Sequence, residues 1–330
     1  MKKSITRYSF SAFVLAAACY SPLSWATQST DFPTKTVNIT VPYGAGGAAD
    51  LLTRAVADQL SKYWEQSVIV ENRPGAVGAI GIGHVIKMKP DGYNLVTTPV
   101  SDLAVNPHLY KSRPFSIDDD LTPVTQMGAV PNLLVVSSQL GVNDVNELVE
   151  LAKTSDKKIS YSSPGLGSQA HIAAEIFREK HELDLQHVPY NSVSNALVDV
   201  IGGHVDLMFV QLPTVQSYLE DESLNVLGVA ARERSPLLPD LNTIQEITGE
   251  DYGDAISWSA LMAPKDTPIE IRLQIAEAVA HVMESTELKQ RLNNMGIEAI
   301  ASTPEALQEA INRDSQYYKD IISTLKIELK

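Results

Sequence analysis

With 330 residues, of which 44% are hydrophobic, the chain is long enough to form two domains that each have a core. Its formal net charge of −14 disfavours nucleic acid and anionic membrane surfaces as partners, because both repel an acidic protein at long range. A small anionic ligand is not excluded, since local N–H dipoles decide its binding at short range.

The first 26 residues have the pattern of a secretory signal peptide. Lys2, Lys3 and Arg7 form a positive start, and residues 10–18 form an apolar core too short to anchor the chain stably across a bilayer. A small-residue cleavage site ends at Ala26. We therefore expect Sec-type export, cleavage near Ala26 and a periplasmic protein.

The alternatives at this end of the chain are an uncleaved membrane anchor and a lipid-modified Cys19. Ala16 stands where a lipoprotein signal usually has a larger aliphatic residue, which disfavours the second alternative. Cleavage after Ala26 would remove the single cysteine, and with it any disulfide or thiolate chemistry. It would also remove three positive side chains and leave a charge of −17. No later stretch is apolar for long enough to span a membrane, so we expect the mature protein to be soluble.

Residues 36–56 have the pattern of a strand, a glycine loop and a helix. Apolar and polar residues alternate from Thr36 to Val41, which is the period of a strand. Pro42 ends the ladder because it has no N–H to donate, and three glycines follow within residues 44–47. Apolar residues then recur at helical spacing from Leu51. A glycine loop lets backbone N–H groups approach a ligand closely, and a helix N-terminus attracts negative charge, so this segment predicts an anion site.

A second segment of the same kind lies about 120 residues further along the chain. Residues 158–177 contain a short strand, the loop Ser162–Ser168 with two glycines, and a helical run. Two strand–loop–helix segments predict two similar lobes that face each other across a ligand.

The other elements follow the order of an α/β protein with mainly parallel strands. Asn143 is a candidate N-cap for the helix that begins near it. The expected strands cover residues 67–71, 93–98, 125–137, 187–190, 205–210, 224–230, 255–263 and 297–300, and the expected helices cover 80–88, 142–153, 194–201, 268–283, 287–294 and 304–325. The strand at 125–137 is expected to cross between the lobes, and the strand at 255–263 to return.

These motifs together resemble the Bug family of periplasmic solute-binding proteins, the extracytoplasmic receptors of tripartite tricarboxylate transporters. The resemblance covers nearly the whole mature chain in order. It is carried by FPTKTVNITVPYGAGGAAD (32–50), VIVENRPGAVGAIG (68–81), PDGYNL (90–95), AVNPHLY (104–110), YSSPGLGSQAHIAAEIF (161–177), HVPY (187–190), ALVDVIGGHVDLMF (196–209) and TPEAL (303–307).

The resemblance implies an α/β, two-lobed periplasmic-binding-protein fold, type II-like, with the ligand in the interdomain cleft. We expect residues 27–126 and 256–330 to form one lobe and residues 127–255 the other. The sequence does not show on which of the two lobes the last helices pack.

The resemblance also implies that the two loops hold a carboxylate, in the family often with the help of ordered water. The expected binding residues are Tyr43, Gly44, Ala45, Gly46, Gly47 and Asp50 in the first loop, Ser163, Pro164, Gly165, Leu166, Gly167 and Ser168 in the second, and Thr98, Ser101, Tyr190 and Val210 at neighbouring strand ends. No catalytic residue, metal or cofactor is expected.

The function that follows is capture of a small organic carboxylate and its delivery to the membrane permease subunits of a tripartite tricarboxylate-type transporter, by a protein expected to be monomeric. Neither loop contains Lys or Arg. Neutral donors suit a mono- or dicarboxylate, including an aromatic one, better than a tricarboxylate clamped by arginines. The alternative from another functional class is an orphan or sensory receptor, which would hand its carboxylate-loaded state to a signalling partner instead of a permease.

Two departures from the family pattern bear on which ligand is bound. Asn191 and Ser192 follow HVPY, where Lys-Gly is usual, and Val210 and Gln211 follow the next strand, where an acidic residue is common. Both positions are expected near the far end of a ligand.

Two enzyme classes are the alternatives from outside the receptor class. Gly44, Gly46 and Ala49 fit a loose dinucleotide-binding fingerprint, but an exported chain would reach a compartment without free nicotinamide cofactor. A hydrolase would need a nucleophile elbow, and no G-x-S-x-G is present. We expect Ser168 to be a loop donor and His171 to pack on a helix face.

Two further residues allow a structural or a ligand-binding interpretation. Asp50, at a helix start, would cap free N–H groups or contact a ligand hydroxyl or ammonium. Trp258 would pack near the hinge or stack on the ligand. In both cases the structural interpretation is favoured.

Overall fold

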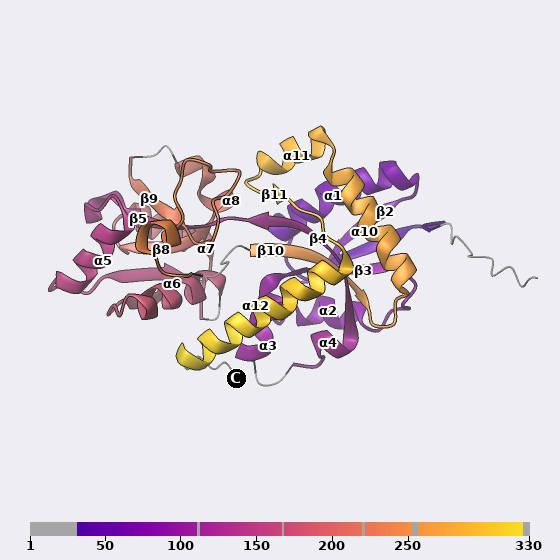
Figure 1. Ribbon diagram of the computed structural model, residues 1–330, viewed down its shortest axis with the longest axis horizontal. Coiled ribbons are helices and arrows are strands. Elements are labelled where there is room, and N and C mark those ends of the chain that lie inside the picture. Colours follow the sequence, from indigo (N-terminus) through magenta and orange to yellow (C-terminus); the bar gives the residue numbers. More distant parts are fainter. Residues whose placement is uncertain (1–31, 111–112, 167, 220–221, 253–256, 326–330) are drawn as a thin grey trace, which may run out of the picture. The chain divides into compact units, whose positions relative to one another are not determined.

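The computed structural model describes residues 32–110, 113–166, 168–219, 222–252 and 257–325. The expected signal peptide lies outside the described residues. Within them, two separate β-sheets are each flanked by helices (Figure 1). No helix in the described ranges is long and apolar enough to cross a membrane.

The first sheet has six strands, mixed in direction. β1 pairs in parallel with β2 and β3, whereas β10 runs antiparallel to β3 and β4, and β11 antiparallel to β4. In sheet order the strands are β11 (Glu298–Ala299), β4 (Leu121–Val130), β10 (Ser257–Pro264), β3 (Asn94–Pro99), β1 (Val37–Val41) and β2 (Val68–Asn72). The helices that follow these strands in the chain are α1 (Ala48–Trp64), α2 (Ala79–Val85), the π-helical turn η1 (Ser101–Val105), α3 (Asn106–Leu109), α4 (Ile117–Asp120), α10 (Ile269–Met283), α11 (Thr286–Asn293) and α12 (Pro304–Leu325).

The second sheet has five strands, with parallel pairing of β6 to β7 and β8, and antiparallel pairing of β5 to β8 and β9. In sheet order the strands are β7 (Gln186–Pro189), β6 (Ser160–Ser163), β8 (Leu207–Gln211), β5 (Asn132–Ser137) and β9 (Leu224–Val229). Its helical segments are η2 (Ser138–Leu140), α5 (Val145–Thr154), α6 (Gln169–Lys180), α7 (Val193–Ile201), α8 (Leu212–Val215), η3 (Gln216–Tyr218) and α9 (Ile244–Thr248).

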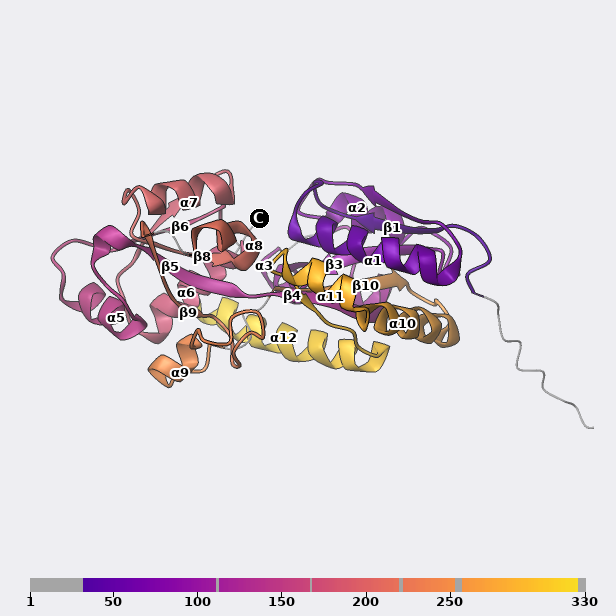
Figure 2. The ribbon, with the colours of Figure 1, turned by 90° about the horizontal axis from the view of Figure 1, so that it is seen from above.

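Helix α1 forms because its apolar residues recur on one face. Leu52, Val56 and Leu60 are fully or almost fully buried and pack against Val37 and Ile39 of β1 in one hydrophobic cluster. Burying each of these side chains favours folding by about 1.5–3 kcal/mol. This face fixes the helix over the sheet, so that its N-terminus lies just beyond the carboxyl end of β1 (Figure 2).

The late helices divide between two locations. α10 and α11 contribute to the same hydrophobic cluster as α1. α12 packs on η1, β4 and α3, and it also contacts α6.

Two sequence expectations need correction. The strand expected at 125–137 is interrupted at Pro131: β4 before it belongs to the first sheet and β5 after it to the second, so the segment does pass from one sheet to the other, but as two strands. The N-cap of α5 is Asp144 rather than Asn143, since the Asp144 carboxylate accepts the Glu147 N–H at 2.9 Å. The Asn143 N–H instead donates to the Glu147 side chain at 2.8 Å.

Candidate functional site

The first loop ends at an open helix N-terminus. Gly47 is the N-cap of α1, and no side chain caps it. The first N–H groups of a helix have no intrahelical partner, and at this end they carry roughly half a positive charge. Only Gly46 in this loop has a positive φ, +85°, a conformation that side chains disfavour. The loop therefore presents backbone donors without a side chain above them.

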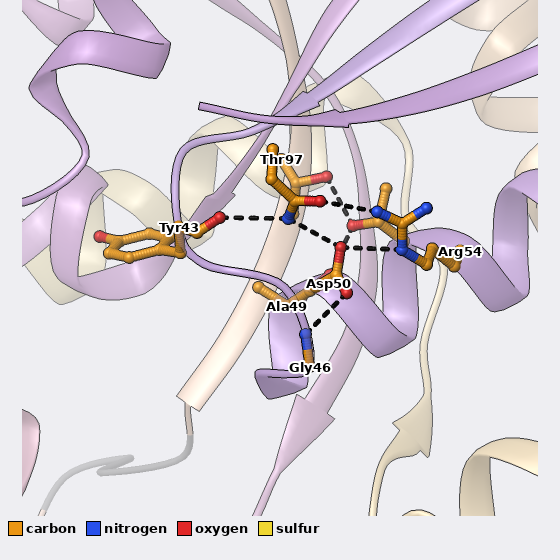
Figure 3. A network of polar contacts seen from close by, with 8 residues as sticks. Tyr43, Gly46, Ala49, Asp50, Arg54 and Thr97 are labelled. Atoms are coloured by element: carbon orange, nitrogen blue, oxygen red, sulfur yellow. Dashed lines mark hydrogen bonds and ion pairs between the residues drawn. The ribbon is translucent and has the colours of Figure 1, made fainter. Parts of the chain in front are cut away.

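Asp50 holds this loop in place (Figure 3). One carboxylate oxygen accepts the Gly46 N–H at 2.9 Å. The other accepts Asn72 Nδ2 at 2.8 Å and Arg54 Nε at 3.0 Å. Asn72 also donates to the Tyr43 carbonyl at 3.1 Å, which ties the loop to the end of β2. Burial alone would raise the pKa of Asp50, but these hydrogen bonds outweigh it and lower the pKa below the ordinary 3.8.

Tyr43 leads from this loop to a buried carboxylate. Its ring points away from Asp50 (Figure 3), and its hydroxyl donates to Asp102 Oδ2 at 2.7 Å. Asp102 is fully buried, and its other oxygen accepts Asn106 Nδ2 at 3.0 Å and meets Arg113 Nη2 at 3.5 Å. Burial and the adjacent Asp102 raise the pKa of the Tyr43 phenol far above its ordinary value, so Tyr43 stays a neutral donor.

The second loop repeats the arrangement with a capped helix. It connects β6 to α6, and Ser168 is the N-cap, whose hydroxyl accepts the His171 N–H at 3.2 Å. The N-terminus of α6 therefore faces the loop in the same orientation as that of α1, with the positive end of the helix dipole toward the loop.

Two histidines lie beneath the second loop. His187 Nε2 is 2.8 Å from Ser163 Oγ, and that hydroxyl also accepts the Gly165 N–H at 3.2 Å. The ring of His171 lies 4.6 Å from that of His187 between centroids. Burial and the neighbouring His187 lower the pKa of His171 to about 4, so this imidazole is neutral at pH 7. The interpretation of His171 as a packing residue agrees with this position.

A cavity of about 360 Å³ opens at the starts of both helices. This is within the usual range of about 300–1,000 Å³ for small-molecule sites. It is lined by Tyr43, Gly44, Gly47, Ala48, Ala49, Asp50, Val77, Pro99, Ser101, Asn106, Val130, Ser168, Gln169, Gln211, Ser257 and Ser259.

The lining has a consistent chemistry. Among the described residues it contains no Lys, Arg or His, and the one carboxylate among them, Asp50, is already hydrogen-bonded to the Gly46 N–H and to Asn72. The remaining polar groups are hydroxyls, amides and backbone N–H groups. The site can therefore solvate an anion with neutral donors but offers no side-chain cation to pair with it.

A larger cavity, of about 480 Å³, lies elsewhere, between η1, α3, α4 and α12. Its lining includes His108, Arg113 and Lys319, but no residue of either glycine loop. Because neither helix start opens into it, we place the candidate site in the smaller cavity.

The structure brings only some of the expected residues to the cavity wall. Those that line it are Tyr43, Gly44, Gly47, Asp50, Ser101 and Ser168. Those that belong to the two loops without lining the cavity are Ala45, Gly46, Pro164, Gly165 and Leu166. Gly167 lies outside the described residues.

Four expected residues point elsewhere. Ser163, Thr98 and Val210 are buried, with 0, 0 and 1% of their surface exposed, and none of them lines the cavity. The Tyr190 hydroxyl donates to the Asp199 carboxylate, and burial together with that carboxylate raises its pKa to about 12. Trp258 is also buried, and its Nε1 donates to Asp314 Oδ2 at 2.7 Å, which agrees with a packing role.

Gln211 was expected near the far end of a ligand, although not as a binding residue, whereas Ser257 and Ser259 were not expected in the lining. Gln211 directly follows Val210, and its side chain donates to Gln169 at 3.3 Å. Ser257 and Ser259 alternate along β10, so both reach the same face of the sheet. The alternation of the two serines in the segment SWSALMA could have predicted that they share one face of the strand.

Comparisons with known proteins agree with this geometry. The model of the family described as "Tripartite tricarboxylate transporter family receptor" matches residues 52–327. Protein BugT of Bordetella pertussis is 28% identical over 319 residues, which cover 96% of each chain. The structure of R. palustris Rpa4515 with adipate is 30% identical, with a TM-score of 0.79, over 90% of this chain and 99% of that chain. The periplasmic binding protein BugD is 26% identical, with a TM-score of 0.74, over 91% of this chain and all of BugD.

These relatives are solute-binding receptors and not enzymes, and their structures share the two-lobed α/β architecture. The dinucleotide-enzyme and hydrolase alternatives are therefore set aside. The chain belongs to the tripartite tricarboxylate transporter receptor (TctC) family, whose members are periplasmic solute-binding proteins of the Bug type.

Proposed function

We propose that this receptor binds a small organic carboxylate in the cavity where helices α1 and α6 begin, and passes it to the membrane permease of a tripartite tricarboxylate-type transporter. The observation that carries the proposal is that two helix N-termini share one cavity, whose lining has no side-chain cation within the described ranges. Such a site favours negative charge through backbone dipoles alone.

The strength of the donors limits the ligand class. A hydrogen bond from a neutral donor to a carboxylate contributes about 1.5–3 kcal/mol, and a helix N-terminus adds about 0.3–1 kcal/mol for each charge. A mono- or dicarboxylate can be held in this way, because its charge is spread over several donors. A tricarboxylate would bring more charge than these uncharged donors can offset. Aromatic acids fit the same reasoning.

A dicarboxylate has a specific fit to the proposed site. One carboxylate would meet the N–H groups at the start of α1, and the other those at the start of α6. The relative with adipate, at 30% identity, supports a dicarboxylate as the class of ligand.

Delivery requires that the permease distinguishes the ligand-bound receptor from the empty one. A ligand that contacts both helix starts binds the closed arrangement more tightly than the open one, and so shifts the population toward it. Only the closed form would then present the surface that the permease recognises.

Export is part of the same proposal. We propose that signal peptidase cuts after Ala26 and releases the receptor into the periplasm. Mass spectrometry of a periplasmic extract should find an N-terminus near Thr27. An intact Met1 in the cytosol would contradict this part of the proposal.

The test of ligand class is a thermal-shift screen of carboxylic acids with calorimetry on every positive result. Binding to the folded state raises the unfolding free energy by RT ln(1+[L]/Kd), or about 2.7 kcal/mol at a hundredfold excess over Kd. We expect stabilisation by mono- or dicarboxylates. Stabilisation only by sugars, cationic amines or metal ions would contradict the proposal.

A further inference from the structure

The turn at residues 75–78 carries an unusual backbone conformation at the edge of the cavity. Ala76 and Val77 have φ values of +47° and +49°, in the left-handed region that L-residues rarely adopt. Val77 is the more unusual of the two, because a β-branched side chain crowds the backbone in this region. A glycine at either position would adopt it without strain.

The surrounding structure holds this turn in place. Gly78, with φ +81°, packs against the pair formed by Tyr43 and Asp102: a Cβ at Gly78 would lie 3.0 Å from Asp102 Oδ2 and 3.3 Å from the Tyr43 hydroxyl. The Ala79 N–H donates back to the Ala76 carbonyl at 3.0 Å. Relaxation of Val77 to an extended conformation would break this contact and this hydrogen bond.

The Val77 side chain is not used in the core. It is 49% exposed, and it belongs to none of the three hydrophobic clusters found in the described ranges. It does line the candidate cavity, together with the apolar groups of Pro99 and Val130. A strained, half-exposed apolar residue at a binding site suggests a role in binding rather than in folding.

We propose that Val77 is a specificity residue, which packs on an unsubstituted hydrocarbon segment of the bound acid. The receptor then prefers carboxylates with a plain alkyl chain or ring over polyhydroxylated acids. This inference rests on the proposed function and narrows it to one substrate class.

The physical basis is the cost of placing a hydroxyl against a methyl group. A ligand hydroxyl that faces the Val77 methyls would lose its hydrogen bonds to water without gaining another partner. A methylene in the same place would instead gain buried apolar contact, which corresponds to about fourfold in affinity for each buried carbon.

The experiment compares two matched probes by calorimetry. Adipate has an unsubstituted chain, and galactarate is the same diacid with a hydroxyl on every inner carbon; benzoate represents an unsubstituted ring. Val77→Thr keeps the β-branch and replaces one methyl by a hydroxyl, and Val77→Gly removes the side chain and its strain. Val198, 59% exposed on α7 and outside the cavity lining, provides the matched controls Val198→Thr and Val198→Gly.

We expect the wild-type protein to bind adipate or benzoate at least tenfold more tightly than galactarate. Val77→Thr should weaken binding of the unsubstituted acid about fourfold or more, and should reduce the ratio of that affinity to the affinity for galactarate. Val198→Thr should change neither the affinity nor the ratio. Val77→Gly should weaken binding further without lowering Tm, whereas Val198→Gly should lower Tm because glycine disfavours a helix interior.

Each contrary outcome has a distinct meaning. If the wild-type protein binds galactarate as tightly as the unsubstituted acids, or if Val77→Thr binds like wild type, the inference is wrong and the carboxylate proposal stands. If Val77→Gly lowers Tm as much as Val198→Gly, the strain argument is wrong, and the inference with it. If no carboxylate binds the wild-type protein at all, the proposed function fails first and the inference fails with it.

Discussion

Asp50 is the residue on which the geometry of the first loop depends, and substitution by asparagine tests that dependence. The carboxylate is 3% exposed, with one oxygen on the Gly46 N–H and the other on Asn72 and Arg54. An asparagine that keeps its oxygen toward Asn72 and Arg54 turns its NH₂ group toward the Gly46 N–H. Two donors then face each other, and Gly46 loses its partner.

The expected loss can be worked out bond by bond. Hydrogen bonds to a charged group contribute about 1.5–3 kcal/mol each, and contributions within one network are not additive. The bond to Arg54 counts for little, because the Arg54 side chain is 44% exposed and solvent screens it. We therefore expect Asp50→Asn to lower the unfolding free energy by about 2–3 kcal/mol, and to weaken ligand binding at least tenfold because the loop loses its anchor.

The effect of pH follows from the direction of the pKa shift. Because the folded protein lowers the pKa of Asp50 below 3.8, the ionised carboxylate stabilises the fold at pH values above the unfolded pKa. This stabilisation is lost as the pH falls through the folded pKa. The difference between wild type and Asp50→Asn should therefore be complete at pH 7 and should shrink below about pH 4.

The assay is urea unfolding followed by circular dichroism, combined with calorimetry of the acid identified by the screen. Asp58→Asn is the matched control, since Asp58 lies on the same helix but is 49% exposed and forms ion pairs with Lys62 and Arg291 at the surface. It should change stability by less than about 1 kcal/mol. A variant Asp50→Asn with wild-type stability and affinity would refute the reasoning. Lost affinity with unchanged stability would instead assign Asp50 to direct ligand contact.

Three further predictions concern the loops and the groups beneath them. Ser168→Ala should lower the free energy of unfolding, measured with urea, by about 1 kcal/mol, because α6 loses its N-cap. Calorimetry on the folded variant should also show weaker ligand binding. Wild-type affinity would show that Ser168 does not contact the ligand. Stability of the apo protein should fall on acidification between about pH 6.5 and 4, because His171 takes up a proton in the unfolded state but not in the fold, where its pKa is about 4. His171→Gln should reduce that pH slope, and an identical slope would show that other groups cause it. Tyr43→Phe should lower the free energy of urea unfolding by about 1–3 kcal/mol, because it removes the hydroxyl that donates to the buried Asp102 Oδ2 at 2.7 Å. An unchanged unfolding midpoint would show that this hydrogen bond makes no net contribution to stability.

The elements with strong periodicity were predictable from the sequence. Alternation from Thr36 to Val41 and helical spacing after Leu51 correspond to β1 and α1, because each has one face that must be buried. The expectation of a strand that pairs near residues 297–300 is confirmed by β11, which pairs with β4. The crossing expected of residues 125–137 is confirmed, since β4 and β5 lie in different sheets, but the single strand expected there was wrong, because the chain breaks the strand at Pro131.

The site was predictable where the loops themselves form it and not where tertiary structure decides which side chain faces the cavity. Ser163 and Ser168 have the same chemistry in one loop, yet Ser163 is buried against His187 while Ser168 lines the cavity. Their different positions depend on where β7 places His187, which no local pattern encodes. Gln211 was recognised in the sequence as a departure from the family pattern beside Val210 and expected near the far end of a ligand, but Val210 was chosen as the binding residue. The strand pairing turns Val210 into the core and leaves Gln211 at the cavity.

The central claim is that an organic acid is held at the starts of α1 and α6 by uncharged donors. The most direct test is a crystal structure of the mature protein with the acid that the screen identifies. The account predicts one carboxylate within hydrogen-bonding distance of backbone N–H groups at the start of α1, near Gly47, and the rest of the ligand reaching the N-terminus of α6 at Ser168. An acid found instead in the larger cavity, against His108 and Lys319, would contradict it.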